Sequence, residues 1–119
     1  MMIRNYVDLE VYQKAYKYSL EIHKKSLGFP KAEQYELAAQ IRRSTKSIAA
    51  NIAEGHGRRT SAMEFKRFLA IAKGSASETR VHLQYCKDLE YLSETEYEDF
   101  DKKYIEVIKM LSKLIQVWK

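Results

Sequence analysis

Residues 36–80 constrain the fold most, because they predict two helices joined by a glycine-marked turn. Side chains suited to a core recur there at steps of three or four, the period of one helix face: Leu37, Ile41, Thr45, Ile48 and Ile52. We expect Gly55 to end the first of these helices, because glycine tolerates the left-handed backbone that often follows a last turn. Ser61 and Glu64 have the spacing of a capping box, which predicts that the next helix starts there.

An earlier helix is predicted from Asp8 to Leu27. Asp8 is a favourable N-cap residue, and Gly28 follows the expected end of the helix. Its expected core face follows a helical spacing through Leu9, Tyr12, Tyr16, Ser19 or Leu20, and His23. Proline cannot continue a helix but suits the first turn of one, so we expect the second helix to open at Pro30 and to run to about Glu54.

The third helix is predicted from Ser61 to about Tyr91, and a fourth from Ser93 onward. The third has core-facing positions at Phe65, Leu69, Ala72, Ala76, Thr79, Leu83 and Cys86. Ser93 and Glu96 repeat the capping-box spacing. The fourth approaches a heptad repeat at Tyr97, Phe100, Tyr104, Val107, Leu111, Leu114 and Trp118. Short connections make successive helices antiparallel, so we predict an all-α, up-down-up-down four-helix bundle, one domain over residues 1–119.

Composition favours an ordered protein outside the membrane. The chain has 45% hydrophobic and 31% charged residues with only 4 Gly and 1 Pro, which excludes a disordered tail. No window approaches the ~18 consecutive apolar residues of a membrane span. The start, MMIRNYVDLE, has no apolar run like that of a signal peptide, and one cysteine excludes an internal disulfide framework. We therefore expect a soluble, cytoplasmic protein.

Positive charge is concentrated in the middle of the chain, which suggests a nucleic-acid partner. The formal net charge is +5, and residues 31–87 hold eleven Lys and Arg against five Asp and Glu. We expect the turn after the second helix to gather Arg42, Arg43, Lys46, Arg58, Arg59, Lys66 and Arg67, near helix N–H groups that suit phosphate. A stripe spaced by seven continues this surface over ~30 Å along Lys66, Lys73, Arg80 and Lys87. The alternative is that these lysines only solvate a helix.

Two rows of small and polar residues are not explained by the packing of a single four-helix bundle. The second helix carries Gln40, Ser44, Ser47, Asn51 and Glu54, and the third carries Ala70, Gly74 and Ser77. A glycine inside a helix costs ~1 kcal/mol relative to alanine. We therefore expect another helix to pack near Gly74, inside the bundle or in another subunit. The alternative is an ordinary solvated face with tight internal packing.

No catalytic, metal or cofactor site is predicted. Glu78, His82 and Cys86 are spaced by four on one helix, but no nearby Cys or His would complete a ligand set. Neither a nucleophile turn nor a phosphate-binding loop motif is present. No module for base-specific recognition appears either, and Tyr12 and Tyr16 fall at core spacings rather than at positions for stacking.

Three segments resemble a known family of bacterial four-helix bundles, the 23S rRNA intervening sequence proteins. They are DLEVYQKA at residues 8–15, QIRRSTKSIAANIAEGHGR at residues 40–58 and FLAIAKGSASE at residues 68–78. The resemblance implies a left-handed bundle that commonly assembles as a ring of five subunits. A similar protein is the accessory subunit of diversity-generating retroelements, where a basic pentamer binds nucleic acid and a reverse transcriptase. Ala49 departs from the proline that many members have, and Tyr12 stands where tryptophan is frequent.

Together, the residues and the resemblance predict a non-catalytic, basic homo-oligomer. It would associate with the backbone of RNA or DNA, without sequence specificity, as an accessory protein. The alternative is a protein-interaction scaffold with no nucleic-acid role, whose charge only aids solubility.

Overall fold

The computed structural model describes residues 5–119, which form four long helices and no strand. They are α1 (Glu10–Ser26), α2 (Leu37–Gly57), α3 (Ala62–Asp88) and α4 (Glu94–Val117). Two short 3-10 turns, η1 (Tyr6–Asp8) and η2 (Lys31–Glu33), precede α1 and α2. The all-α prediction with four helices is confirmed for this part of the chain. Residues 1–4, which belong to the start that we examined for a signal peptide, lie outside it.

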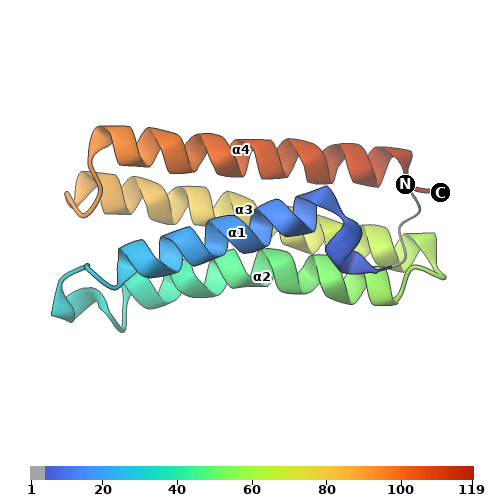
Figure 1. Cartoon of the computed structure of the whole chain (residues 1–119), viewed down its shortest axis with the longest axis horizontal. Helices are drawn as coiled ribbons and strands as arrows, with labels where there is room; N and C mark the ends of the chain where they lie inside the picture. The colour runs from blue at the N-terminus through green and yellow to red at the C-terminus, as the bar shows by residue number, and fades with distance from the viewer. Residues whose placement is uncertain (1–4) are drawn as a thin grey trace.

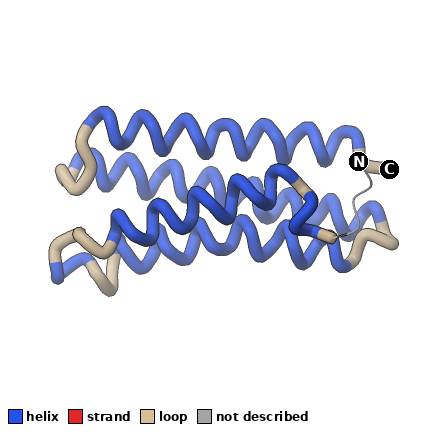
Figure 2. Tube along the Cα trace, in the orientation of Figure 1, coloured by secondary structure: helices blue, strands red, loops and turns tan. Residues whose placement is uncertain are grey.

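The four helices lie side by side along the long axis of a body measuring 44 × 24 × 21 Å (Figure 1). The α1–α2 and α3–α4 connections lie at one end, and the α2–α3 connection lies at the other (Figure 1). Loops are confined to these ends (Figure 2). Each helix packs against its neighbours in sequence, and α1 also packs against α4. None of the described helices has the length and apolar character that a membrane span needs.

The core follows the predicted faces of α2 and α3. Every expected core position of these two helices is buried, from Leu37 to Ile52 and from Phe65 to Cys86. In α4, Tyr104, Val107 and Leu111 are fully buried. The remaining positions of its heptad pack at the core edge, namely Tyr97, Phe100, Leu114 and Trp118.

The predicted face of α1 is wrong in part. Leu9 and Ser19 are buried as expected, but the other buried residues form a different row, which comprises Val11, Ala15, Tyr18, Ile22 and Ser26. Tyr16 is 50% exposed, Leu20 is 44% exposed, and Tyr12 is half-buried. Asp8 does not cap α1. Its carboxylate accepts a bond from the backbone N–H of Asn5 at 3.2 Å, as part of the capping box at the start of η1. Two apolar rows run along this helix, and local spacing cannot tell which one the other helices cover.

The second helix begins later than predicted. Pro30 opens η2, where the N–H of Glu33 donates to the Pro30 carbonyl at 2.8 Å, and α2 starts only at Leu37. The side-chain amide of Gln34 donates to the carbonyls of Ser26 and Phe29 at 3.0 and 2.9 Å. The α1–α2 connection is therefore a hydrogen-bonded turn, and α2 continues through Ala49 without a break.

Gly55 does not end α2, which continues to Gly57. Its backbone is helical, since no described glycine has a positive φ. A Cβ atom at Gly55 would lie 2.7 Å from Cβ of Phe68 and 3.1 Å from Cδ1 of Phe65. The glycine is needed for the close approach of α3, not for a turn.

The N-caps predicted at Ser61 and Ser93 are present. The Ser61 hydroxyl accepts from the Glu64 N–H at 3.2 Å, although the Glu64 carboxylate does not return the bond. Ser93 and Glu96 form both bonds of a capping box. The third helix ends at Asp88, earlier than expected, because the chain reverses at Glu90, whose φ is 67°.

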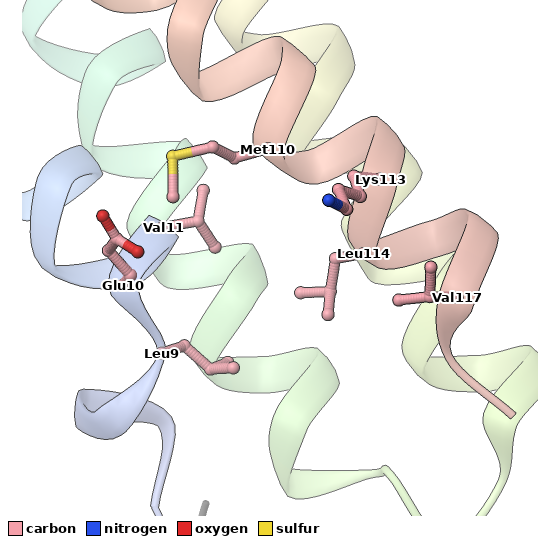
Figure 3. Close-up of a pocket in the computed structure, with 7 residues that line it drawn as sticks. All are labelled: Leu9, Glu10, Val11, Met110, Lys113, Leu114 and Val117. Carbon is pink, nitrogen blue, oxygen red and sulfur yellow. The ribbon is translucent and has the colours of Figure 1, made fainter. Parts of the chain in front are cut away.

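A shallow apolar groove remains between α1 and α4. It has a volume of about 270 Å³, and Figure 3 shows side chains from the start of α1 facing those of α4 across it. Its apolar lining residues are Leu9, Val11, Met110, Leu114 and Val117.

Candidate nucleic-acid interface

The predicted basic residues do not form one cluster at the α2–α3 turn. Because α2 is continuous, the sixteen-residue step from Arg42 to Arg58 separates them by about 24 Å along the helix axis. Arg43 and Lys46 therefore lie toward the other end of the bundle. The expectation that all of them surround the turn is wrong, and the rise of a regular helix is the reason.

The cations at the turn are largely neutralised by carboxylates. Arg67 donates to Glu64 at 2.9 Å, and Arg58 lies 3.6 Å from Glu54 and 3.9 Å from Glu64. The bond from Arg67, together with the charge of Arg58, lowers the pKa of Glu64 below its ordinary value. Both guanidinium groups also lie over the Phe68 ring, at 5.2 Å for Arg58 and 4.5 Å for Arg67. Arg59 donates to the His56 carbonyl, at 2.9 Å.

Arg42 has a structural role in the α1–α2 connection. Its guanidinium donates to the Ser26 hydroxyl at 3.1 Å, and to the backbone and side-chain oxygens of Gln34 at 2.9 and 3.2 Å. These donors are therefore occupied within the protein. Replacing Arg42 would disturb the fold as well as any ligand.

The predicted stripe along α3 divides into two parts. Arg80 forms a two-point pair with Asp101 of α4, at 2.7 and 3.2 Å, and the ammonium of Lys87 lies 4.5 Å from the Tyr97 ring centroid. These two residues tie α3 to α4. Lys66 and Lys73 are half-buried and form no ion pair with any described residue.

Four available cations lie on α1 and α2. Arg43 and Lys46 of α2 are exposed, as are Lys17 and Lys24 of α1, and none of the four has an ion-pair partner among the described residues. Sequence reasoning did not single out Lys17 and Lys24. Their spacing of seven, the same as that of the α3 stripe, was the signal that could have found them. Residues 37–53 of α2 also contain no Asp or Glu.

The polar row of α2 is used mainly within the bundle. The hydroxyls of Ser44 and Thr79 are 2.8 Å apart, and those of Ser47 and Ser75 are 3.0 Å apart, so both pairs join α2 to α3. Asn51 donates to the Ser47 carbonyl at 2.8 Å. Glu54 pairs with Arg58, and Gln40 is exposed.

The small residues of α3 face outward. Ala70, Gly74 and Ser77 are all exposed. A Cβ atom at Gly74 would meet no atom within 4 Å. Nothing inside the chain therefore packs near Gly74, and the expectation of a contact within the bundle is wrong. The expectation of a contact in another subunit stays a prediction.

The three potential metal ligands on α3 do not converge. His82 lies 3.0 Å from the carboxylate of exposed Glu78, whereas Cys86 is fully buried in the core. Burial raises the pKa of the Cys86 thiol to about 12, so it remains protonated at neutral pH.

Comparisons with known proteins identify a family and a solved structure that this chain resembles. The family described as 23S rRNA-intervening sequence protein matches residues 7–113. A crystal structure of a protein of unknown function, from the S23 ribosomal protein family of Bacteroides thetaiotaomicron, is 28% identical. The match covers 90% of this chain and 96% of that one, with a TM-score of 0.82. Curated proteins offer no match.

Proposed function

We propose that this chain, which belongs to the 23S rRNA-intervening sequence protein family, is a non-catalytic accessory protein that binds the backbone of RNA or DNA. The unpaired cations Arg43 and Lys46 carry this proposal, because they lie on a stretch of α2 that has no acidic residue. Phosphate groups bind such cations without regard to sequence, and each neutralised phosphate makes the affinity more dependent on salt.

The proposal includes a homo-oligomer, with five subunits as the resemblance implies, in the cytoplasm. Its subunit is an up-down-up-down, left-handed bundle; the ends at which the connections lie in Figure 1 support the alternation. The exposed row of Ala70, Gly74 and Ser77 supports self-association, since small side chains let a second helix approach closely. A ring would repeat the α1–α2 cations around its circumference.

A salt series with labelled RNA and DNA tests the proposal, on protein sized by light scattering. We expect affinity to fall steeply as salt rises from low to physiological concentration. The double variant Arg43→Gln with Lys46→Gln should weaken binding and reduce the salt slope by between one and two, since each phosphate contact contributes about 0.7 to 0.9.

The matched control is Lys102→Gln with Lys109→Gln, which removes the same charge from exposed positions of α4. It should leave most of the affinity and of the slope intact. An equal loss in both variants would show that only net charge matters. No binding by the wild-type protein at low salt would exclude the proposal.

A protein-interaction scaffold is the second candidate function, and the outer face of α3 favours it. Beyond Gly74, this face exposes Val81 by 49% and Tyr85 by 59%. A partner protein such as a reverse transcriptase could cover it. Binding of such a partner should persist at high salt and fall with Tyr85→Ala, whereas nucleic-acid binding should not.

A further inference from the structure

Three tyrosines form a ladder on the outer side of η1 and α1. The rings of Tyr6 and Tyr12 meet edge to face, with centroids 4.9 Å apart. Tyr12 and Tyr16 are stacked, with centroids 6.0 Å apart and an angle of 21° between their planes. Tyr6 and Tyr12 are half-buried, whereas Tyr16 is 50% exposed. The ladder therefore ends in an aromatic ring that is held by its neighbour and open to solvent.

The ladder lies on the α2 side of α1. His23 is on the same helix face as Tyr16, about 10 Å further along the axis. Burial lowers the pKa of His23, and the nearby positive charges of Lys46 and Arg42 lower it further, so this face of α1 is directed to α2. The connection folds α2 back along α1 (Figure 1), so the part of α2 beside Tyr16 comes after Lys46 in the sequence.

Cations without an ion-pair partner among the described residues continue from the ladder toward one end of the bundle. Lys17 follows Tyr16 on α1 and Lys24 lies about 12 Å beyond Tyr16 along the axis, and Arg43 and Lys46 lie on the part of α2 nearer to Lys24. The acidic residue of α1 within this stretch, Glu21, pairs with Lys103 of α4 at 2.8 Å and so faces away. From Tyr16 to Lys24 the face extends about 12 Å, the length of three to four stacked nucleotides at ~3.4 Å each.

We propose that this face binds a single strand, with an unpaired base stacked on Tyr16 and the phosphates held by the cations of α1 and α2. The inference rests on the proposed function and names its substrate class. In a duplex the faces of the bases are already stacked on one another, so only an unpaired base can lie on a tyrosine ring. A ring held by Tyr12 loses little freedom when a base covers it. An exposed ring followed by lysines and a guanidinium group along the same two helices suits a polyanion that alternates phosphates with aromatic bases.

The test compares Tyr16→Leu with the wild-type protein on one short RNA sequence, offered as a single strand and as a duplex. Leucine keeps apolar bulk at a half-exposed site, so the fold should survive, which circular dichroism checks. We expect the dissociation constant for the single strand to rise about 5- to 150-fold, as loss of one base–aromatic stack predicts. Duplex affinity and the salt slope should not change. Tyr85→Leu, at an equally exposed tyrosine on α3, is the matched control and should have no effect.

Ultraviolet cross-linking followed by peptide mapping gives a second measurement, and we expect the cross-link at Tyr16. Unchanged single-strand affinity in Tyr16→Leu, or a cross-link at Tyr85, would overturn the inference. The proposed function would still stand in that case if the Arg43 and Lys46 double variant binds more weakly than the wild-type protein. Protection of Tyr16 from hydroxyl-radical labelling in the nucleic-acid-free protein would also overturn it, because a second copy of the chain would then cover the ring. Absence of binding to either RNA would overturn both.

Discussion

The α2–α3 and α1–α4 contacts hold the bundle together in different ways. Between α2 and α3, small side chains allow close approach: Gly55 lies against Phe65 and Phe68, and the buried hydroxyls of Ser44 and Thr79 bond to each other. Between α1 and α4, long charged side chains bridge a wider gap. Tyr18 donates to Glu106 at 2.9 Å, Lys14 lies 3.2 Å from Glu106, and Lys25 pairs with Glu96.

The comparison shows that one chain can use packing on one side and charge on the other. Close packing depends on complementary shape. Its contribution to stability should therefore be insensitive to salt, and substitutions within it should be poorly tolerated. Ion pairs that remain partly exposed contribute little individually and weaken when salt or acid is added. The apolar groove in Figure 3 lies where α1 and α4 do not fill the gap.

The largest effect is expected from Gly55→Ala. The added Cβ would lie within 3.3 Å of the Phe65 carbonyl oxygen as well as against two aromatic side chains, so α3 must move. We expect the free energy of unfolding to fall by about 3 kcal/mol, the upper range for overpacking. Urea denaturation monitored by circular dichroism measures it.

Gly74→Ala is the matched control, since the same substitution there meets no atom within 4 Å. It should stabilise the protein by up to about 1 kcal/mol through helix propensity. A loss at Gly74 as large as at Gly55 would mean that a second subunit covers α3. Equal, small effects at both sites would contradict the close packing of α2 on α3.

A smaller effect is expected from Thr79→Val, which removes one hydroxyl of the buried pair. Ser44 would keep its bond to the Ile41 carbonyl at 3.2 Å, so we expect the free energy of unfolding to fall by about 1 kcal/mol.

Lys103→Met, which removes the pair with Glu21 across α1 and α4, should cost less, about 0 to 1 kcal/mol. Added salt should reduce the Lys103→Met effect and leave that of Thr79→Val unchanged. A salt-sensitive effect of Thr79→Val together with a salt-insensitive effect of Lys103→Met would contradict the comparison.

The third prediction separates the two contacts by pH. At the end of α2, burial and then the charge of Arg59 lower the pKa of His56 from 6.5, although Asp8 opposes this. As pH falls, the unfolded chain therefore protonates at this histidine before the folded protein does. The free energy of unfolding should fall as pH drops below about 6.5. Across α1 and α4, bonds from Lys25 lower the pKa of Glu96 from 4.5. The stability it provides is present above 4.5 and is lost as pH falls through the lower, folded-state value.

Hydrogen exchange as a function of pH would resolve these two steps. Amides of α1 and α4 should lose protection mainly below pH 4.5, where Glu106 also loses the bonds from Tyr18 and Lys14 that lower its pKa. The variant His56→Phe should remove the part of the loss near pH 6.5 that belongs to His56, and the part that remains should come from His23, whose pKa is also lowered. A single loss of protection shared by all four helices at one pH would contradict the separation.

Sequence analysis predicted helices and caps well because their signals are local. Ser93 and Glu96 are three residues apart and form their capping box whatever the rest of the chain does. The candidate site was predicted less well. Counting cations placed Arg80 on a phosphate-binding stripe, but its partner Asp101 is twenty-one residues away in sequence and belongs to another helix.

The sequence by itself determined four helices, their core faces in α2 and α3, and an excess of positive charge, because these follow from periodicity and composition. Only the tertiary structure decided which row of α1 is buried, that Gly55 serves packing, and which cations remain unpaired. These depend on the helix that lies opposite each residue. Tyr16 shows the difference: its spacing suits a core, and its exposure beside Tyr12 was settled by how α1 rotates against α2 and α4.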